Sequence, residues 1–331
     1  MTAGERVGLE TVTAVVLNWN QADLAIRSVT ALVDDGMPPA RIVVVDNGST
    51  DGSWERLSSS LRHCRRVRIS ENVGFARGNN VGARALTGGA YLFVNSDAFV
   101  HRPGSVAALV RALERRSVGV VFPRLLDESL ALQPSVFPLP GPPSAFVRAT
   151  GLSRFVPDSL QPRLGTHWDH GASREIGCAA GAVVLVRDTT WAAVGGFPET
   201  AFMYAEETGL CLAAAELGWK AWFCADAEFT HLGGGSTGER WDDAQRAERI
   251  ATANARLIRD HLSPLDRNLT LAFVRAGLMA RRGYWTLAGR DAAVAECKAL
   301  LRGYASRDGN GDGDGSLADP TIDVFPPESG G

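Results

Sequence analysis

The sequence is poor in cysteine, and its five cysteines (Cys64, Cys178, Cys211, Cys224 and Cys297) form no C-x-x-C pair. Their odd number and wide spacing predict neither a disulfide framework nor a zinc site, and favour reduced thiols in a cytoplasm. The opening MTAGERVGLE has no basic start followed by an apolar stretch, so we expect no signal peptide. The longest apolar run, near AAGAVVLV, is far too short to span a bilayer.

The chain also lacks an excess of either charge. Its 34 Lys and Arg against 37 Asp and Glu give a formal net charge of −3, which provides no electrostatic argument for nucleic-acid binding. With 331 residues, 45% of them hydrophobic, the chain is long enough for one large or two small domains with a sizeable core. We therefore expect a cytoplasmic protein that at most lies on the inner surface of a membrane.

Strands alternate with helices in the first third of the sequence. The apolar patterns predict strands at 12–20, 41–53 (running into turns), 66–71 and 90–95, and helices at 24–36 and 53–63. Residues 72–88 predict a Gly/Asn-rich loop that leads into another helix. This alternation predicts a parallel, doubly wound sheet with right-handed crossovers.

Polar clusters follow three of these strands, at Asn18–Asn20, Asp46–Asn47 and Asn95–Asp97. Ligands of such sheets bind beyond the carboxyl ends of the strands, so the three clusters predict a binding site at one edge. Asp97 comes directly after the apolar run YLFVN, and a buried, unpaired carboxylate is costly. Asp97 is therefore expected either to reach solvent or to be neutralised by a cation.

The remaining sequence is more varied. The proline-rich residues 123–172 predict a long loop, followed by a strand and short helix in GAVVLVRDTTWAAVGGF, a helix near 206–218 and a strand at 220–225. Residues 241–303 are expected to be helical with a break at Pro264, and residues 304–331 to form a disordered tail. Within that tail, residues 308–319 loosely fit a calcium loop, but they lack the final Glu, which favours a flexible polar segment.

Six motifs occur in a characteristic order: VVVDNGSTDGS, ENVGFARGNNVGARA, NSDA, GGF, FMYAEETGLCLAAAELGW and HLGGGS. With them the sequence resembles family-2 glycosyltransferases of the GT-A fold, most closely their rhamnosyltransferase-like bacterial branch, from about residue 12 to 237. The resemblance implies an α/β fold in which helices flank a mixed, mostly parallel sheet. It also implies a GT-A domain over residues 1–240, with a nucleotide-sugar half at about 12–122 and an acceptor half at about 173–240.

The resemblance implies a nucleotide-diphosphate sugar as donor. Asp46 would bind the nucleotide, with a turn-forming role before Gly48 as the alternative. Asn18 and Asn20 would contact the base or ribose, although Asn also simply closes strands. Arg77 would face phosphate or lie on a plain helix start. The full set of expected nucleotide-binding residues is Asn18, Asn20, Asp46, Asn72, Gly74, Arg77, Asn79, Asn95 and Ser96.

Enzymes of this fold bind Mg²⁺ or Mn²⁺ at an Asp-x-Asp-like triplet. Here the triplet is Asn95-Ser96-Asp97, so only Asp97 keeps its carboxylate. One carboxylate can suffice when phosphate oxygens and water complete the coordination. His231 matches a position that can supply a second ligand, whereas a lone histidine is usually structural.

The family pattern also places Glu-Asp at the start of a helix, with the second acid as the base. Glu207 falls at that position and Glu206 precedes it, so Glu207 is the expected base and Glu206 the alternate. Acids also favour helix starts through the helix dipole, which would make this a capping feature. The chain departs from the pattern twice, with Glu in place of Asp and with Gly209 where a further acid is common.

These features predict an inverting, metal-dependent glycosyltransferase that uses a dTDP- or UDP-sugar, with dTDP-rhamnose as the leading donor. The acceptor would be a hydroxyl of a lipid-linked saccharide or a natural product. Residues 269–285 mix apolar and basic side chains, which fits a membrane surface or a packed or dimer-forming helix pair. The alternatives are a catalytically decayed scaffold of the same fold and a sugar-nucleotide nucleotidyltransferase. The latter lacks support, because no glycine-rich basic loop follows the first strand.

Overall fold

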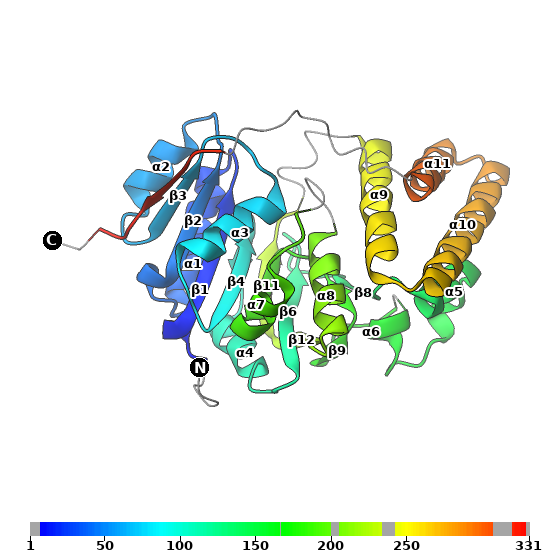
Figure 1. Ribbon diagram of the computed structural model, residues 1–331, viewed down its shortest axis with the longest axis horizontal. Helices are drawn as coiled ribbons and strands as arrows, with labels where there is room; N and C mark the ends of the chain where they lie inside the picture. Colours follow the sequence, from blue (N-terminus) through cyan, green and yellow to red (C-terminus); the bar gives the residue numbers. More distant parts are fainter. Residues whose placement is uncertain (1–6, 166, 200–204, 234–241, 307–319, 329–331) are drawn as a thin grey trace.

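The computed structural model describes residues 7–165, 167–199, 205–233, 242–306 and 320–328, and its centre is a mixed sheet flanked by helices (Figure 1). The strands of the sheet are β1 (Val12–Asn18), β2 (Ile42–Asn47), β3 (Arg65–Ile69), β4 (Ala90–Asn95), β5 (Ala98–Val100), β6 (Val118–Leu126), β7 (Leu132–Gln133), β9 (Arg174–Ile176), β11 (Val183–Arg187), β12 (Lys220–His231) and β13 (Ile322–Phe325). Nine of these described strands follow the order β13-β3-β2-β1-β4-β11-β6-β12-β5, with β7 beside β6 and β9 beside β12.

Most long strands run in one direction. β1 pairs in parallel with β2 and β4, and β2 pairs in parallel with β3. β11 is antiparallel to both β4 and β6, so β6 and its parallel partner β12 have the same direction as β1. The register places Asn18 beside Asp46 and Leu17 beside Asn95, so the predicted polar strand ends lie next to one another. This mixed, mostly parallel sheet is the predicted fold class.

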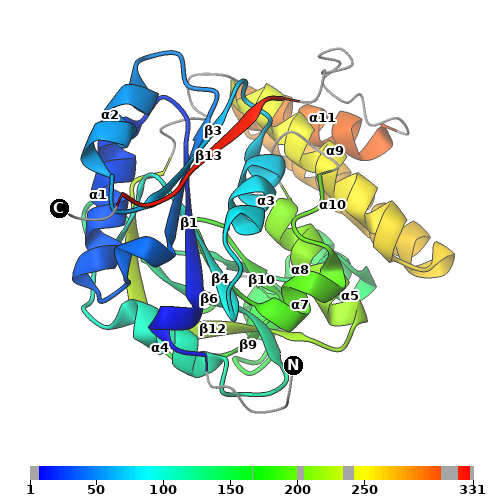
Figure 2. The same ribbon diagram turned by 60° about the vertical axis from the view of Figure 1, so that its left-hand side comes forward.

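Helices cover both faces of the sheet (Figure 2). On one face lie α1 (Ala22–Asp34), α2 (Ser53–Ser60) and α4 (Ser105–Ala112), whose apolar residues share a core with Val12, Ala14 and Val16 of β1. On the other lie α3 (Phe75–Ala85), α7 (Asp188–Val194) and α8 (Glu206–Glu216), which pack on the alternate residues of the same strands. This alternation explains why the strands read as continuous apolar runs: both faces of each strand are buried.

The C-terminal helical region consists of α9 (Asp243–His261), α10 (Pro264–Leu287) and α11 (Asp291–Ala305), gathered at the opposite end of the molecule from β3 (Figure 1). The predicted break at Pro264 is confirmed. Ser263 caps α10 by accepting a hydrogen bond from the Asp266 N–H, and Pro264 occupies the first turn, where no amide hydrogen is needed. Among the described helices, none combines the length and the apolar character needed to cross a membrane.

The prediction of a long loop over residues 123–172 is wrong in part. β6 continues to Leu126, β8 (Val136–Phe137) pairs with β10 (Cys178–Ala179), and three helical segments follow: α5 (Pro142–Thr150), η3 (Leu152–Phe155) and α6 (Gln161–Leu164). The prolines that suggested a loop begin a helix instead, because Pro142 and Pro143 occupy the first turn of α5. α5 packs against α10.

The prediction of a disordered tail over residues 304–331 is also corrected. Ile322–Phe325 form β13, which pairs antiparallel with β3 and covers the edge of the sheet (Figure 2). The Phe325 ring lies 5.1 Å from that of Trp54, and Glu328 pairs with the nearly buried Arg66 at 3.0 Å. These contacts offset the entropy of ordering a short segment. The calcium-loop pattern at 308–319 lies outside the described residues.

We predict that the packing of α3 on the sheet tolerates no side chain at Gly82. A Cβ there would lie 2.4 Å from Val15 Cγ1 and 2.8 Å from Val45 Cγ2, in the fully buried core. Gly82→Ala is expected to lower the free energy of unfolding by about 1–3 kcal/mol through overpacking. The matched control is Gly283→Ala in the exposed part of α10, where a Cβ meets nothing within 4 Å; it should raise stability by about 0.5–1 kcal/mol. Thermal melting of both variants checks this, and equal melting temperatures would contradict it.

Candidate active site

The first predicted cluster is a hydrogen-bonded corner at the ends of β1 and β2. Buried Asn18 donates from Nδ2 to Asp46 Oδ1 (3.0 Å) and to Ser49 Oγ (3.1 Å), and its Oδ1 accepts from the Gln21 N–H. Its amide is thus used to orient Asp46. The Asp46 Oδ2 atom is buried and makes no hydrogen bond with the described residues. One oxygen of this carboxylate therefore has no hydrogen-bond donor among the described residues.

Burial raises the pKa of Asp46, and hydrogen bonds from Ser49 and Asn18 partly oppose that rise. The desolvation of the carboxylate is therefore only partly compensated within the protein. A donor group from a bound molecule would complete the compensation.

Asn20 and Ser49 hold the loops above this corner. Asn20 has φ of 55°, and its side-chain Oδ1 accepts from the Thr50 N–H (2.9 Å) while its own N–H donates to Ser49 Oγ (2.9 Å). The side-chain oxygen of Asn20 therefore joins two loops of the protein. Ser49 was not singled out from the sequence; its place in a strand–turn motif was the available signal.

The loop and helix start at residues 72–79, within the motif ENVGFARGNNVGARA, are held in place by Asn47. Asn47 Nδ2 donates to Asn72 Oδ1 (3.0 Å) and to the carbonyl of Gly74 (3.2 Å), and Asn72 Oδ1 also accepts from the Gly74 N–H. Gly74 has φ of 85° and is the N-cap of α3. Arg77 lies half-buried in the first turn of α3. Buried Asn79 donates to the Phe75 carbonyl within the helix, so its amide nitrogen has an internal partner.

The second strand-end cluster brings together Asp97 and His231. β12 pairs antiparallel with β5, placing His231 opposite Ala98, and the Leu232 N–H donates to the Asp97 carbonyl (3.1 Å). His231 Nε2 lies 3.5 Å from Asp97 Oδ1. His231 Nδ1 lies 3.0 Å from Gln133 Oε1, so each ring nitrogen faces an oxygen atom and Gln133 orients the ring toward Asp97.

The other two members of the triplet have different surroundings. Ser96 Oγ donates to Gln21 Oε1 (3.0 Å), and the Asn95 N–H donates to the carbonyl of Ala182, leaving a half-buried Asn95 side chain. Gln21 and Gln133 were not predicted, because the residues that they contact are about 75 and 98 positions away in the chain.

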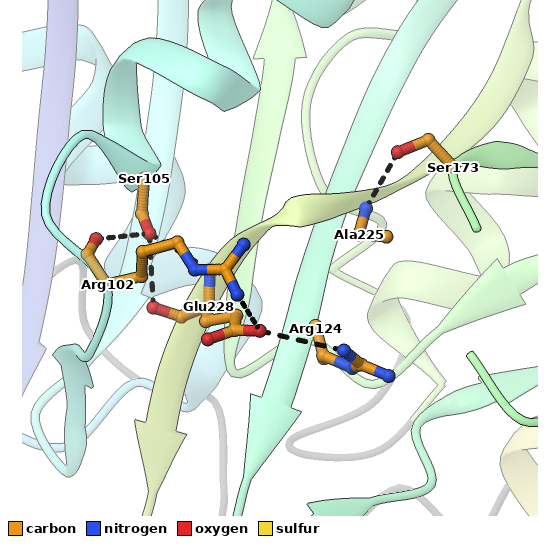
Figure 3. Close-up of polar contacts among 6 residues, drawn as sticks. All are labelled: Arg102, Ser105, Arg124, Ser173, Ala225 and Glu228. Carbon is orange, nitrogen blue, oxygen red and sulfur yellow. Dashed lines mark hydrogen bonds and ion pairs between the residues drawn. The ribbon is translucent and has the colours of Figure 1, made fainter. Parts of the chain in front are cut away.

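β12 has a register shift between Cys224 and Glu228, and Figure 3 shows the polar contacts of Glu228 at this irregularity. The Glu228 carboxylate, after the register shift, pairs with Arg102 (2.8 Å) and Arg124 (3.6 Å). Ser105 Oγ accepts from the Glu228 N–H (2.9 Å) and donates to the Arg102 carbonyl (2.6 Å). The two arginines offset the cost of removing the Glu228 carboxylate from water. These contacts fix the strand three residues before His231 and were not visible from the sequence.

The two adjacent acids differ in their surroundings at the start of α8. Glu206 is 4% exposed, whereas Glu207 lines a cavity of about 390 Å³. The backbone of Gly181 approaches Glu207 closely: a Cβ there would lie 3.4 Å from Glu207 Oε2. Burial raises the pKa of Glu207, while backbone N–H groups of Glu207 and Gly181 lower it. A carboxyl group with a raised pKa that faces a cavity suits proton abstraction.

The departure at Gly209 has a packing explanation. A Cβ at this position would lie 2.6 Å from Pro198 Cγ and 3.1 Å from Leu257 Cδ2. A further acid therefore cannot fit here without displacing Pro198 and shifting the Leu257 side chain of α9. The rest of the motif, FMY at 202–204, lies outside the described residues, as do residues 234–237 of HLGGGST.

Taken together, the structure places Asn18, Asp46 and Asn20 in one corner and Asp97 with His231 in a second. Glu207 lies in a separate cavity. Within the described residues, no group of three or more His, Cys, Asp or Glu side chains surrounds a common point that could hold a metal. Any cation at Asp97 and His231 would therefore need ligands from water or from a bound molecule.

Three comparisons relate the chain to known proteins. Residues 13–133 match the family model Glycosyl transferase family 2. Two proteins from two strains of Mycobacterium tuberculosis, both named N-acetylglucosaminyl-diphospho-decaprenol L-rhamnosyltransferase, are 28% identical over 224 residues, which are 60% of this chain and 69% of each relative.

Two solved structures share the fold. The mannosyltransferase PcManGT from Pyrobaculum calidifontis, in complex with GDP-Man and Mn²⁺, has a TM-score of 0.57 at 18% identity, covering 89% of this chain and 86% of that one. GalNAc-T7 with UDP, GalNAc and Mn²⁺ has a TM-score of 0.54 at 13% identity, covering 75% of this chain and 48% of that one. At these identities the likeness concerns the fold.

The raised pKa of Glu207 predicts a pH-dependent stability. The folded state holds the Glu207 proton more tightly than the unfolded state does, so stability falls as pH rises from the ordinary glutamate value of 4.5 through the raised folded-state pKa. Relative to Glu207→Gln, the wild type should therefore lose stability over this pH range and show a constant difference above it. Chemical unfolding of both proteins between pH 4 and 8 tests this. A difference that does not change with pH would contradict it.

Proposed function

Since the chain carries a glycosyl transferase family 2 domain at residues 13–133 and is a glycosyltransferase, as its sequence predicted, we propose that it is an inverting, metal-dependent enzyme. It moves a sugar from a nucleotide-diphosphate donor to an acceptor hydroxyl. The observation that supports this most directly is the pairing of Asp97 with His231 beside the incompletely bonded Asp46, at one edge of a GT-A sheet.

The donor nucleotide is proposed to bind at the corner formed by Asn18 and Asp46. Asp46 Oδ2 accepts a hydrogen bond from the base or ribose, and Asn18 keeps the carboxylate in position. The loop at Asn72, Gly74 and Arg77 is the proposed cover of the donor. Asn20 and Asn79 use side-chain atoms within the protein, so their proposed part in binding is to hold these loops.

The residues at Asp97 suit a divalent cation. A carboxylate oxygen and an imidazole nitrogen lie 3.5 Å apart, and the contact between Nδ1 and Gln133 fixes the orientation of the ring. The structures of PcManGT and GalNAc-T7 were each solved with Mn²⁺. Asp97 and His231 would hold Mg²⁺ or Mn²⁺, and the ion would neutralise negative charge on the diphosphate. Asn95 and Ser96 shape the turn that presents Asp97.

Glu207 is the proposed base, with Glu206 as its alternate. Its carboxylate takes the proton of the acceptor hydroxyl while the acceptor oxygen forms a bond to the anomeric carbon. The bond from that carbon to the diphosphate oxygen breaks, and the electron pair leaves with the nucleoside diphosphate. Attack opposite the leaving group inverts the anomeric centre. Glu206, almost fully buried, packs at the start of the same helix.

The donor is proposed to be a dTDP- or UDP-sugar, with dTDP-rhamnose first, because the similar mycobacterial proteins are named L-rhamnosyltransferases. The acceptor in their name, a diphospho-decaprenol-linked sugar, supports a lipid-linked saccharide for this chain. Exposed apolar residues on α10, Leu265, Met279 and Leu287, support a contact with the inner face of a membrane. A contact between two copies of the chain would bury the same surface.

We expect UDP or dTDP to bind only with Mn²⁺ or Mg²⁺ present, because Asp97 and His231 lie at the proposed diphosphate site. Asp97→Ala should weaken calorimetric binding at least tenfold, the scale of a charge-assisted contact of about 1.5–3 kcal/mol. Asp226→Ala is the control, since Asp226 is an exposed acid on the same strand as His231. If neither UDP nor dTDP binds under any metal condition, a catalytically decayed fold is favoured. Metal-independent binding would remove Asp97 from the metal site.

Replacing Glu207 by Gln is expected to lower kcat/KM for sugar transfer by about 10²–10⁴, the usual contribution of a general base. Nucleotide affinity should stay unchanged, because Glu207 lies in the separate cavity. Glu206→Gln is the comparison variant, and a loss confined to it would make Glu206 the base. In the wild type, kcat/KM should fall as pH drops through the raised pKa of Glu207. A flat profile down to the ordinary value of 4.5 would contradict its role.

A further inference from the structure

The cavity at Glu207 is built mainly by the helical C-terminal region and by α5, which stand together at one end of the molecule (Figure 1). Its volume of about 390 Å³ matches that of a site for one compact organic group. Much of its lining is apolar: Phe137, Pro138, Pro140, Ala145, Ala149, Ile250, Ile258, Val274, Leu278 and Leu300. A group that fills this space is therefore expected to be largely apolar.

Three uncharged polar side chains in the lining already have partners within the protein. Ser144 Oγ donates to the Leu139 carbonyl, Asn254 Nδ2 to the Ile250 carbonyl and Thr270 Oγ1 to the Asp266 carbonyl. Each bond joins residues close in sequence, so these side chains have fewer donors and acceptors left to bond the hydroxyls of a sugar. The cavity therefore suits the apolar part of an acceptor better than a bare saccharide.

The charges of the cavity are asymmetric. Glu207 is the one acid in the lining, whereas Arg148 on α5 and Arg281 on α10 are both cationic and exposed. Neither arginine forms an ion pair within the part of the chain that the structure describes. Tyr304 of α11 also lines the cavity; burial raises its pKa and neighbouring Arg148 lowers it. Arg148 and Tyr304 thus come close together although they belong to different helices.

We propose that this cavity selects an amphiphilic, anionic acceptor: the apolar walls hold its body, Arg148 and Arg281 bind its negatively charged group, and its hydroxyl reaches Glu207. That the bound molecule is the acceptor rests on the proposed function. The negatively charged group is a phosphate ester or a carboxylate, both of which match the planar guanidinium. The two sources, a phosphate-linked lipid and a soluble aromatic acid, share this chemistry.

Calorimetric binding of four probes tests the proposal: geranyl diphosphate, 4-hydroxybenzoate, neutral octyl β-D-glucoside below its micelle concentration, and N-acetylglucosamine. EDTA is present throughout, so that binding of a diphosphate to a metal at Asp97 does not contribute. We expect at least one anionic probe to bind the wild type more tightly than both neutral probes. The tighter of the two anionic probes then identifies the source, diphosphate for a lipid carrier and carboxylate for an aromatic acid.

The double variant Arg148→Ala/Arg281→Ala should bind the anionic probe at least tenfold more weakly than the wild type does, with unchanged affinity for the neutral probes. Arg282→Ala is the matched control, because Arg282 follows Arg281 on α10 but does not line the cavity. Melting temperatures verify that each variant is folded. Equal binding of neutral and anionic probes, an equal loss in Arg282→Ala, or no anionic binding up to millimolar concentration would each overturn the proposal.

Nucleotide titration separates this inference from the proposed function. Arg148→Ala/Arg281→Ala should bind UDP or dTDP with metal as the wild type does, since both arginines lie at the Glu207 cavity. Loss of probe binding with intact nucleotide binding supports the acceptor site. Probe binding in a protein that binds no nucleotide would support the anion-binding cavity and refute the transferase mechanism.

Discussion

The parallel pairing of β1 with its two neighbours is the constraint on which the proposed donor side depends. β1 lies between β2 and β4, and all three run in one direction, so their carboxyl ends meet at one edge. This register sets Asn18 against Asp46 and brings the Asn95–Asp97 turn alongside. A shift of one residue would turn the alternating apolar side chains of β1 away from their own helix layers. The same packing that buries Val15 and Val16 therefore also sets the spacing of the polar groups.

The proposed acceptor side is assembled differently. Its cavity takes lining residues from α5, α8, α9, α10 and α11, which come together by helix packing rather than through strand register. Close approaches at small residues hold this packing: a Cβ at Gly277 would lie 2.8 Å from Ala149 Cα, and one at Gly303 would lie 2.4 Å from the Glu248 carbonyl. The enzyme thus combines a sheet edge of fixed geometry with a helical wall whose side chains can differ without disturbing the donor site.

Local patterns in the sequence predicted much of the fold and several candidate residues. The strand-end positions of Asp46 and Asp97 followed from apolar runs, and the break at Pro264 followed from the chemistry of proline. The partners Gln21, Gln133 and Glu228 could not be predicted, because tertiary contacts between distant segments select them. The same reason accounts for β13: a short segment in a polar, glycine-rich context has no local signal, and its order comes from β3 and Trp54. The prolines at the start of α5 suggested a loop, because the residue type alone does not distinguish a helix start from a loop.

The pairing of β13 with β3 also affects how the chain is made. Thr321 bonds to Ser70 across 251 residues of sequence, so the ribosome completes β3 long before its outer neighbour exists. At translation rates of about 5–20 residues per second, this edge stays open for roughly 13–50 s. Unpaired strand edges promote association with other chains. Arg65, Arg66 and Arg68 place three positive charges along β3, and this charge discourages such association until the covering strand has been synthesised.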